Sequence, residues 1–174
     1  KVILDANSIT RERALYLKRG NPEIEFVYQP LSCRRFDLNK HTDGVWTIIK
    51  EGVIISTPSG SNSTLETLFP DWDILYLDHK DKDLRDVADS KKILWSPDQI
   101  PPEYRKWVGY SPETFFDVNC LSVNSENVLV TRYNKKVFEF LEKHKVNPIE
   151  VSFRHRYLWD GGLHSLTFDY YREH

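Results

Sequence analysis

The sequence of 174 residues is 40% apolar and 13% aromatic and carries a net charge of −2, a composition typical of one globular domain over residues 1–174. Lysine and arginine are scattered among aspartate and glutamate, so no basic stripe indicates a nucleic-acid partner. No apolar run approaches the ~20 residues that cross a membrane, and two cysteines, Cys33 and Cys120, are too few for a secreted disulfide framework, which favours the cytoplasm.

The first predicted elements are short strands on either side of a polar stretch. Val2–Leu4 is a strand-like run that ends at Asp5, which is either a functional carboxylate at the end of an α/β strand or a turn carboxylate. Residues 11–22 predict a weak helix or an exposed loop closed by a turn, and Ile24–Tyr28 alternates as a strand. Because the chain starts directly on an apolar run, we expect it to begin inside a domain.

From residue 41 onward the predicted elements repeat as a ββαβ unit. The first copy has strands at Val45–Ile49 and Val53–Ser56, a helix at Thr64–Phe69 and a strand at Ile74–Leu77. The second copy has strands at Val118–Val123 and Val128–Thr131, a helix at Lys135–His144 and a strand at Ile149–Phe153. Since one such unit cannot bury its own apolar face, at least three are expected to meet around a common axis.

The two copies are separated by residues 78–114, a stretch rich in charge and proline. Four aromatic residues are interleaved with them, namely Trp95, Tyr104, Trp107 and Tyr110. Disordered segments are usually poor in aromatic residues, so this stretch is predicted to be a folded insertion or a lid-like ordered loop over a site.

The run Asp160-Gly161-Gly162-Leu163-His164-Ser165 near the C-terminus has the character of a site. Two glycines permit positive φ angles and let backbone approach a ligand closely. They precede an alternating segment, Leu166–Tyr170, that predicts a strand with Ser165 at its mouth. The alternative is a glycine turn before a buried edge strand.

Three motifs together resemble the amidinotransferase branch of the guanidine-modifying enzymes, the glycine and inosamine-phosphate amidinotransferases, which are relatives of arginine deiminases. Gly161–Ser165 is similar to the family's nucleophile motif, in which a cysteine takes the place of Ser165. Leu4–Asn7 and His41–Asp43 are similar to the motifs that carry the family's acid and histidine. The resemblance covers nearly the whole chain and implies a pentein-type α/β propeller of ββαβ modules, incomplete at the N-terminal side.

The resemblance also implies roles for individual residues. Ser165 takes the position of the catalytic nucleophile, His41 that of the proton donor and general base, and Asp5 that of the acid that orients the histidine. Asp43 is expected to face the substrate guanidinium. Further substrate-binding candidates are Asn119, Gly162, His164 and Arg154. From the residues alone, Asn119 can equally be a polar residue flanking a strand, and Arg154 a partner in a surface ion pair.

Two departures from the family pattern bear on activity. A thiol can be held as a thiolate, whereas serine needs a base during attack, and His41 kept as an imidazolium leaves none. The chain as written is therefore predicted to be inactive or nearly so, as a trapped variant or a natural pseudoenzyme. In addition, Thr57–Ser61 contains no basic residue where the family places the arginine that clamps a substrate carboxylate.

The leading hypothesis is an amidinotransferase that moves an amidino group from an arginine-like guanidine to an amine acceptor through a covalent intermediate on residue 165. The alternatives are an arginine deiminase or dihydrolase, in which water resolves the intermediate, and a non-catalytic guanidine-binding pseudoenzyme. No cofactor is implied, and the histidines show no metal-ligand spacing. The acceptor and the oligomeric state, monomer or oligomer, stay open.

Overall fold

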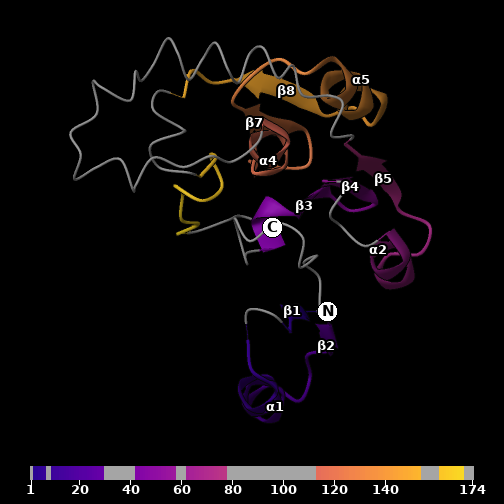
Figure 1. Ribbon diagram of the computed structural model, residues 1–174, viewed down its shortest axis with the longest axis vertical. Coiled ribbons are helices and arrows are strands. Elements are labelled where there is room, and N and C mark those ends of the chain that lie inside the picture. Colours follow the sequence, from indigo (N-terminus) through magenta and orange to yellow (C-terminus); the bar gives the residue numbers. More distant parts are fainter. Residues whose placement is uncertain are drawn as a thin grey trace, which may run out of the picture.

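The computed structural model of the chain describes residues 2–6, 9–29, 42–57, 62–77, 113–153 and 161–170. Within these ranges the chain forms three successive α/β units (Figure 1). Two predicted site residues, His41 and Arg154, lie outside the described residues, as do the side chain of Asp5 and residues 78–112 of the predicted insertion.

The first unit is a parallel strand pair with a covering helix. It contains β1 (Val2–Asp5), α1 (Arg11–Gly20) and β2 (Phe26–Gln29), with Val2 opposite Phe26. The Thr10 side chain accepts a hydrogen bond from the Arg13 N–H and caps the start of α1. Of the two options predicted for this stretch, the helix is therefore the one that forms.

The second unit has the predicted ββαβ order. A short 3₁₀ turn, η1 (Thr42–Gly44), leads into β3 (Trp46–Lys50), β4 (Val53–Ser56), α2 (Asn62–Leu68) and β5 (Asp73–Tyr76). Strand β4 pairs antiparallel with β3 and parallel with β5. The tight β3–β4 turn contains Gly52 at φ +81°, a conformation that side chains rarely adopt.

The third unit repeats this order after one added helix. It contains α4 (Glu113–Val118), β6 (Leu121–Ser122), β7 (Asn127–Val130), α5 (Lys135–Lys143) and β8 (Asn147–Glu150). Strand β7 pairs antiparallel with β6 and parallel with β8, as in the second unit. The predicted repeat is confirmed, but the strand predicted from Val118 begins only at Leu121, because Val118 is the last residue of α4.

Buried apolar side chains join the units to one another. The cluster between the second and third units is formed by Ile49, Val53, Ile55, Leu77, Val118, Cys120, Val128, Val130, Val137, Leu141 and Val146. The cluster inside the second unit is formed by Val45, Trp46, Ile54, Leu65, Leu68 and Phe69. Ile3 and Val27 of the first unit pack against the latter cluster. Cys120 is 1% exposed, so its thiol is part of this shared core.

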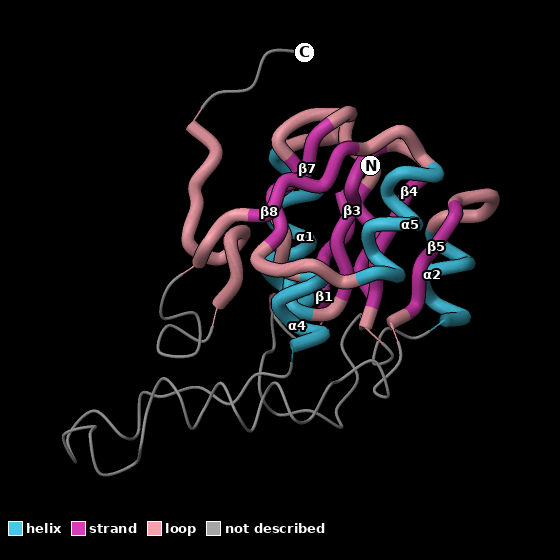
Figure 2. Tube along the Cα trace, turned by 90° about the horizontal axis from the view of Figure 1, so that it is seen from above, coloured by secondary structure: helices cyan, strands magenta, loops and turns pink. Residues whose placement is uncertain are grey.

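Polar contacts also tie the second unit to the third. The Lys50 ammonium donates to the His144 carbonyl at 2.6 Å, and Asp73 Oδ2 lies 2.6 Å from Lys143 Nζ and 2.9 Å from His144 Nε2. The hydrogen bond from Lys143 lowers the pKa of Asp73. Figure 2 shows the two units side by side, in keeping with contact between β3 and β6.

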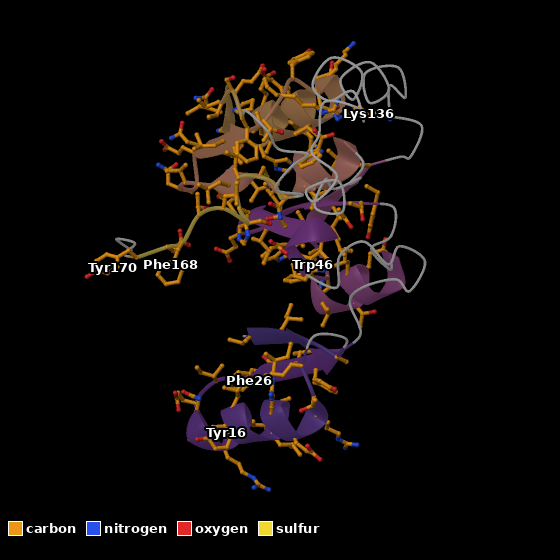
Figure 3. The ribbon with its side chains drawn as sticks, turned by 60° about the vertical axis from the view of Figure 1, so that its left-hand side comes forward. Tyr16, Phe26, Trp46, Lys136, Phe168 and Tyr170 are labelled. Atoms are coloured by element: carbon orange, nitrogen blue, oxygen red, sulfur yellow. The ribbon has the colours of Figure 1, made fainter. Side chains whose placement is uncertain are left out.

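The prediction of a strand over Leu166–Tyr170 is wrong. Residues 163–166 form a turn, in which Thr167 Oγ1 donates to the Leu163 carbonyl at 2.9 Å, and no strand occurs within the described residues 161–170. Phe168 and Tyr170 are 89% and 95% exposed and project away from the body of the molecule (Figure 3). An alternating pattern forms a strand only against a neighbouring strand, and no described strand pairs with the backbone of residues 166–170.

Replacing Leu141 by alanine tests the importance of the shared core. Leu141 is fully buried between the second and third units, so Leu141→Ala is expected to lower the free energy of unfolding by about 2–5 kcal/mol. The matched control is Leu15→Ala on α1, where the side chain is 46% exposed and the loss is expected to stay below about 1 kcal/mol. Chemical denaturation measures both, and equal losses would contradict the packing described.

Candidate functional site

Asn119 joins three segments that are far apart in the sequence. It is fully buried between α4 and β6, and its Nδ2 group donates to the Asp43 carbonyl and to Asp43 Oδ2, both at 3.0 Å. Its Oδ1 accepts from the Ser165 N–H at 3.0 Å and from the Ser165 hydroxyl at 2.9 Å. A primary amide has two donors and two acceptor lone pairs, so its full hydrogen-bonding capacity is used when the Ser165 hydroxyl donates to Oδ1.

Asp43 provides a negative charge in the site. It lies in η1, directly before β3, and its Oδ2 is the partner of Asn119 Nδ2 at 3.0 Å, His164 Nδ1 at 3.2 Å and Ser165 Oγ at 3.2 Å. The hydrogen bond from the His164 ring, supported by those from Asn119 and Ser165, lowers the pKa of Asp43 to about 2 against the opposing effect of burial. The carboxylate is therefore ionised throughout the neutral pH range.

The Ser165 hydroxyl lies between two oxygen acceptors. Its single proton can be donated to Asn119 Oδ1 at 2.9 Å or to Asp43 Oδ2 at 3.2 Å, but not to both at once. Its backbone N–H is fixed by the same Asn119 amide. Residue 165 is thus held by its backbone and presents its side chain to the carboxylate.

Gly162 allows the C-terminal loop to come this close. A Cβ atom at this position would lie 2.4 Å from the Asn119 carbonyl oxygen and 2.8 Å from both Asn119 Cβ and Oδ1, distances that real Cβ atoms essentially never show. The His164 N–H donates to the same Asn119 carbonyl at 3.3 Å. The predicted close approach of backbone at the glycine pair is therefore present, although its partner in this structure is Asn119.

A cavity of about 380 Å³ runs from His164 along the edge of β3 toward the β6–β7 turn. Its other lining residues are Thr47, Ile48, Ile49, Lys50, Glu51, Ser122, Asn124 and Ser125. Because His164 lines the cavity and also contacts Asp43, the cavity adjoins the polar cluster. Its volume is within the range of small-molecule sites.

The structure brings together five of the predicted site residues, namely Asp43, Asn119, Gly162, His164 and Ser165. The backbone of Asp5 ends strand β1, as predicted, and its side chain lies outside the described residues together with His41 and Arg154. Among the described residues, no group of three or more histidine, cysteine or acidic side chains is arranged to hold a metal ion. In the same part of the chain, no helix has the length and apolarity needed to span a bilayer.

Main-chain oxygens contribute to the site in a way that no sequence motif indicates. The carbonyls of Asp43 and Asn119 each accept a hydrogen bond from another segment. Asp43 and Asn119 lie three and two residues before the first strands of their ββαβ units. The strand registers align Asp43 with Asp117 and not with Asn119, so aligning the two copies of the repeat would not have paired these residues.

Comparisons with known proteins point to one group of enzymes. No protein-family model matches the chain. In sequence the chain is 21% identical over 150 residues to inosamine-phosphate amidinotransferase 1 of Streptomyces griseus, a match that covers 82% of this chain and 36% of that protein.

Two solved structures are similar in fold. SxtG, an amidinotransferase from Microseira wollei in the saxitoxin biosynthetic pathway, matches with a TM-score of 0.60 and 20% identity, over 92% of this chain and 38% of that one. StrB1, the inosamine-phosphate amidinotransferase of Streptomyces griseus, matches with a TM-score of 0.58 and 19% identity, over 93% and 40%. The chain spans about two fifths of the length of these relatives.

The comparisons confirm two expectations from the sequence. The chain resembles the amidinotransferase branch of the guanidine-modifying enzymes, and its ββαβ units have the pentein-type α/β propeller fold of those proteins. At this level of identity the structural likeness concerns the fold, and the activity of this chain is a separate question.

Adding a methyl group at Gly162 tests the close approach to Asn119. We expect Gly162→Ala to lower the free energy of unfolding by about 1–3 kcal/mol, because the Cβ would meet backbone that cannot move aside cheaply. Gly20→Ala is the control, since no atom lies within 4 Å of its added Cβ and an unchanged or slightly higher stability is expected. Thermal and chemical denaturation measure the free energy of unfolding of both variants. If Gly162→Ala were as stable as Gly20→Ala, the close contact with Asn119 would be contradicted.

The lowered pKa of Asp43 predicts a pH-dependent contribution to stability. Its folded-state pKa of about 2 lies below the ordinary 3.8, so the contribution is fully present above about pH 4 and is lost as the pH falls toward 2. Allowing for solvent screening, Asp43→Asn is expected to cost about 1–2 kcal/mol at pH 6 and clearly less at pH 2. Urea titrations at both pH values measure the difference. Glu126→Gln in an exposed turn is the control, and a cost for Asp43→Asn that does not depend on pH would refute the prediction.

Proposed function

We propose that this chain forms the nucleophile-bearing part of an amidinotransferase-like site that binds an arginine-like guanidine, and that the serine form does not transfer the amidino group. The observation that carries the proposal is the position of Ser165 Oγ, 3.2 Å from the Asp43 carboxylate and 2.9 Å from Asn119 Oδ1. The similarity in sequence and fold to amidinotransferases supports it.

The charge of the site suits a planar cation. A guanidinium presents N–H groups in one plane, and a carboxylate accepts such groups in short charge-assisted hydrogen bonds. Asp43 offers this carboxylate, ionised at neutral pH, and Asn119 Oδ1 lies on the same side of Ser165. A guanidinium held by Asp43 would have its central carbon close to the side chain of residue 165.

The proposed reaction requires a thiolate at position 165. With cysteine there, the thiolate forms a bond to the guanidinium carbon, and the C–N bond to the leaving amine breaks as that nitrogen takes up a proton. An amine acceptor then attacks the same carbon and loses a proton, and the bond to sulfur breaks. His41 as the proton donor and Asp5 as its orienting acid remain proposals that rest on the motif resemblance, as does substrate contact by Arg154.

Serine lacks what this chemistry needs. A hydroxyl must lose its proton to a base during attack, and among the described residues the carboxylate that accepts from Ser165 Oγ is that of Asp43, with a pKa of about 2. Such a weak base cannot generate a useful concentration of alkoxide. The serine hydroxyl instead acts as a hydrogen-bond donor within the site, so non-catalytic binding of a guanidine is the state proposed for the chain as written.

Restoring the thiol tests the proposal. We expect the full-length serine protein to bind arginine in calorimetry without turnover. Ser165→Cys is expected to release at most one equivalent of ornithine per site without an acceptor, as the covalent intermediate forms, and to release ornithine continuously only when an amine acceptor is present. Loss of a catalytic nucleophile usually costs roughly 10⁴- to 10⁶-fold in rate, so the gain should be unmistakable. Ser152→Cys, an exposed serine after β8, controls for the presence of a new thiol.

Three results would count against the proposal, each in a different way. Citrulline formation without an acceptor would assign the cysteine variant to the hydrolases. Absence of turnover of any guanidine would remove the enzymatic proposal. Failure of the serine protein to bind arginine or related guanidines would remove the binding proposal.

A further inference from the structure

A largely buried ion pair lies two residues along the chain from Asn119. Asp117, near the end of α4, is 5% exposed, and its two carboxylate oxygens accept from Arg132 Nε at 2.9 Å and Arg132 Nη2 at 2.7 Å. Asn134 Nδ2 adds a third hydrogen bond at 2.8 Å. The pair therefore ties the end of α4 to the connection between β7 and α5.

The geometry of this pair fixes an orientation as well as a distance. A guanidinium that donates two nearly parallel hydrogen bonds to one carboxylate restricts the rotation of both groups. Asn134 is itself held in place, because its Oδ1 accepts from the Lys136 N–H and caps α5. The Asp117 side chain is thus bound to the residue that caps the start of α5.

Asn119 follows Asp117 by two residues. Val118 and Cys120, its neighbours on either side, are 0% and 1% exposed and belong to the shared core. The segment 117–120 is therefore fixed by packing at two positions and by the ion pair at its start. The Asn119 side-chain amide can form hydrogen bonds to both Asp43 and Ser165 only if the backbone of residues 117–120 keeps its orientation.

We propose that Asp117 and Arg132 are positioning residues that set the orientation of the Asn119 amide and through it the distance between Asp43 and the residue at position 165. The inference rests on the proposed guanidine site and extends it to two residues that do not touch the reacting atoms. Loss of the ion pair should then weaken guanidine binding more than it lowers the free energy of unfolding of the whole chain.

Energetic considerations favour a positioning role over a purely stabilising one. Removing two charged groups from water costs free energy that their mutual attraction largely offsets, so a buried ion pair is often no more stabilising than apolar residues of the same volume. What apolar residues do not supply is a directional constraint. The Asp117–Arg132 pair supplies that constraint two residues from the amide that organises the site.

Two substitutions separate positioning from folding. Arg132→Lys keeps the charge but loses the two-pronged hydrogen bond, and Asn134→Ser keeps a helix cap but removes the third donor to Asp117. The control is Lys135→Gln, which breaks an exposed ion pair with Glu139 on the same helix. All variants are made in the full-length serine protein.

The first readout is hydrogen exchange of individual backbone amides, which needs no ligand. Because the Ser165 N–H is bonded to Asn119 Oδ1, we expect its exchange to accelerate at least about tenfold in Arg132→Lys and less in Asn134→Ser, while the amides of β7 and β8 keep their protection. Lys135→Gln should change neither. An unchanged Ser165 amide in both variants, or an equal acceleration in β7 and β8, would overturn the inference.

The second readout is calorimetric affinity for arginine, where Arg132→Lys is expected to weaken binding by about tenfold or more. A change in exchange at Ser165 with unchanged affinity would also overturn the inference, because the pair would then not act on the site. If the parent serine protein binds no guanidine, the proposed function fails, and the exchange experiment alone judges whether the pair orients Asn119.

Discussion

The side-chain amide of Asn119 is the interaction on which the rest of the site depends. One group satisfies the carboxylate and carbonyl of Asp43 through its two N–H donors, and the hydroxyl and N–H of Ser165 through its oxygen. A rotated amide would place its oxygen against the Asp43 carboxylate and carbonyl and its NH₂ group against the Ser165 N–H, so three favourable contacts would become unfavourable together. The orientation of this amide is therefore strongly determined, and so is the relation between the acid and residue 165.

The repeat explains why these residues meet. Asp43 lies just before β3 and Asn119 just before β6, and these two strands are in contact. The shared apolar cluster brings the two strand starts together, and the polar residues there face each other as a consequence. The C-terminal loop then reaches this point because Gly162 has no side chain to collide with Asn119. Packing thus places the site, and hydrogen bonds define its fine geometry.

The sequence was a reliable guide where the pattern is local. The ββαβ order and the bounds of the helix predicted at Lys135–His144 depend on residues close in the chain, and both appear in the structure nearly as predicted. The segment after Ser165 was misjudged, because an alternating pattern describes which side chains are alike and not whether a partner strand is present. The part played by Asn119 was likewise undervalued, since its partners lie 76 and 46 residues away and depend on how the units dock.

The identity of residue 165 changes the electrostatics of the site more than its shape. A hydroxyl carries no charge, and it can donate its hydrogen bond to either of the two acceptor oxygens beside it. A thiolate at this position would face the ionised Asp43 carboxylate, and like charges at this distance raise the free energy of the empty site. With cysteine at position 165, a bound guanidinium would offset the repulsion between the thiolate and the Asp43 carboxylate. With serine, the guanidinium would neutralise the charge of Asp43 alone. In the proposed site, serine therefore removes the nucleophile and leaves the negative charge that attracts the cation.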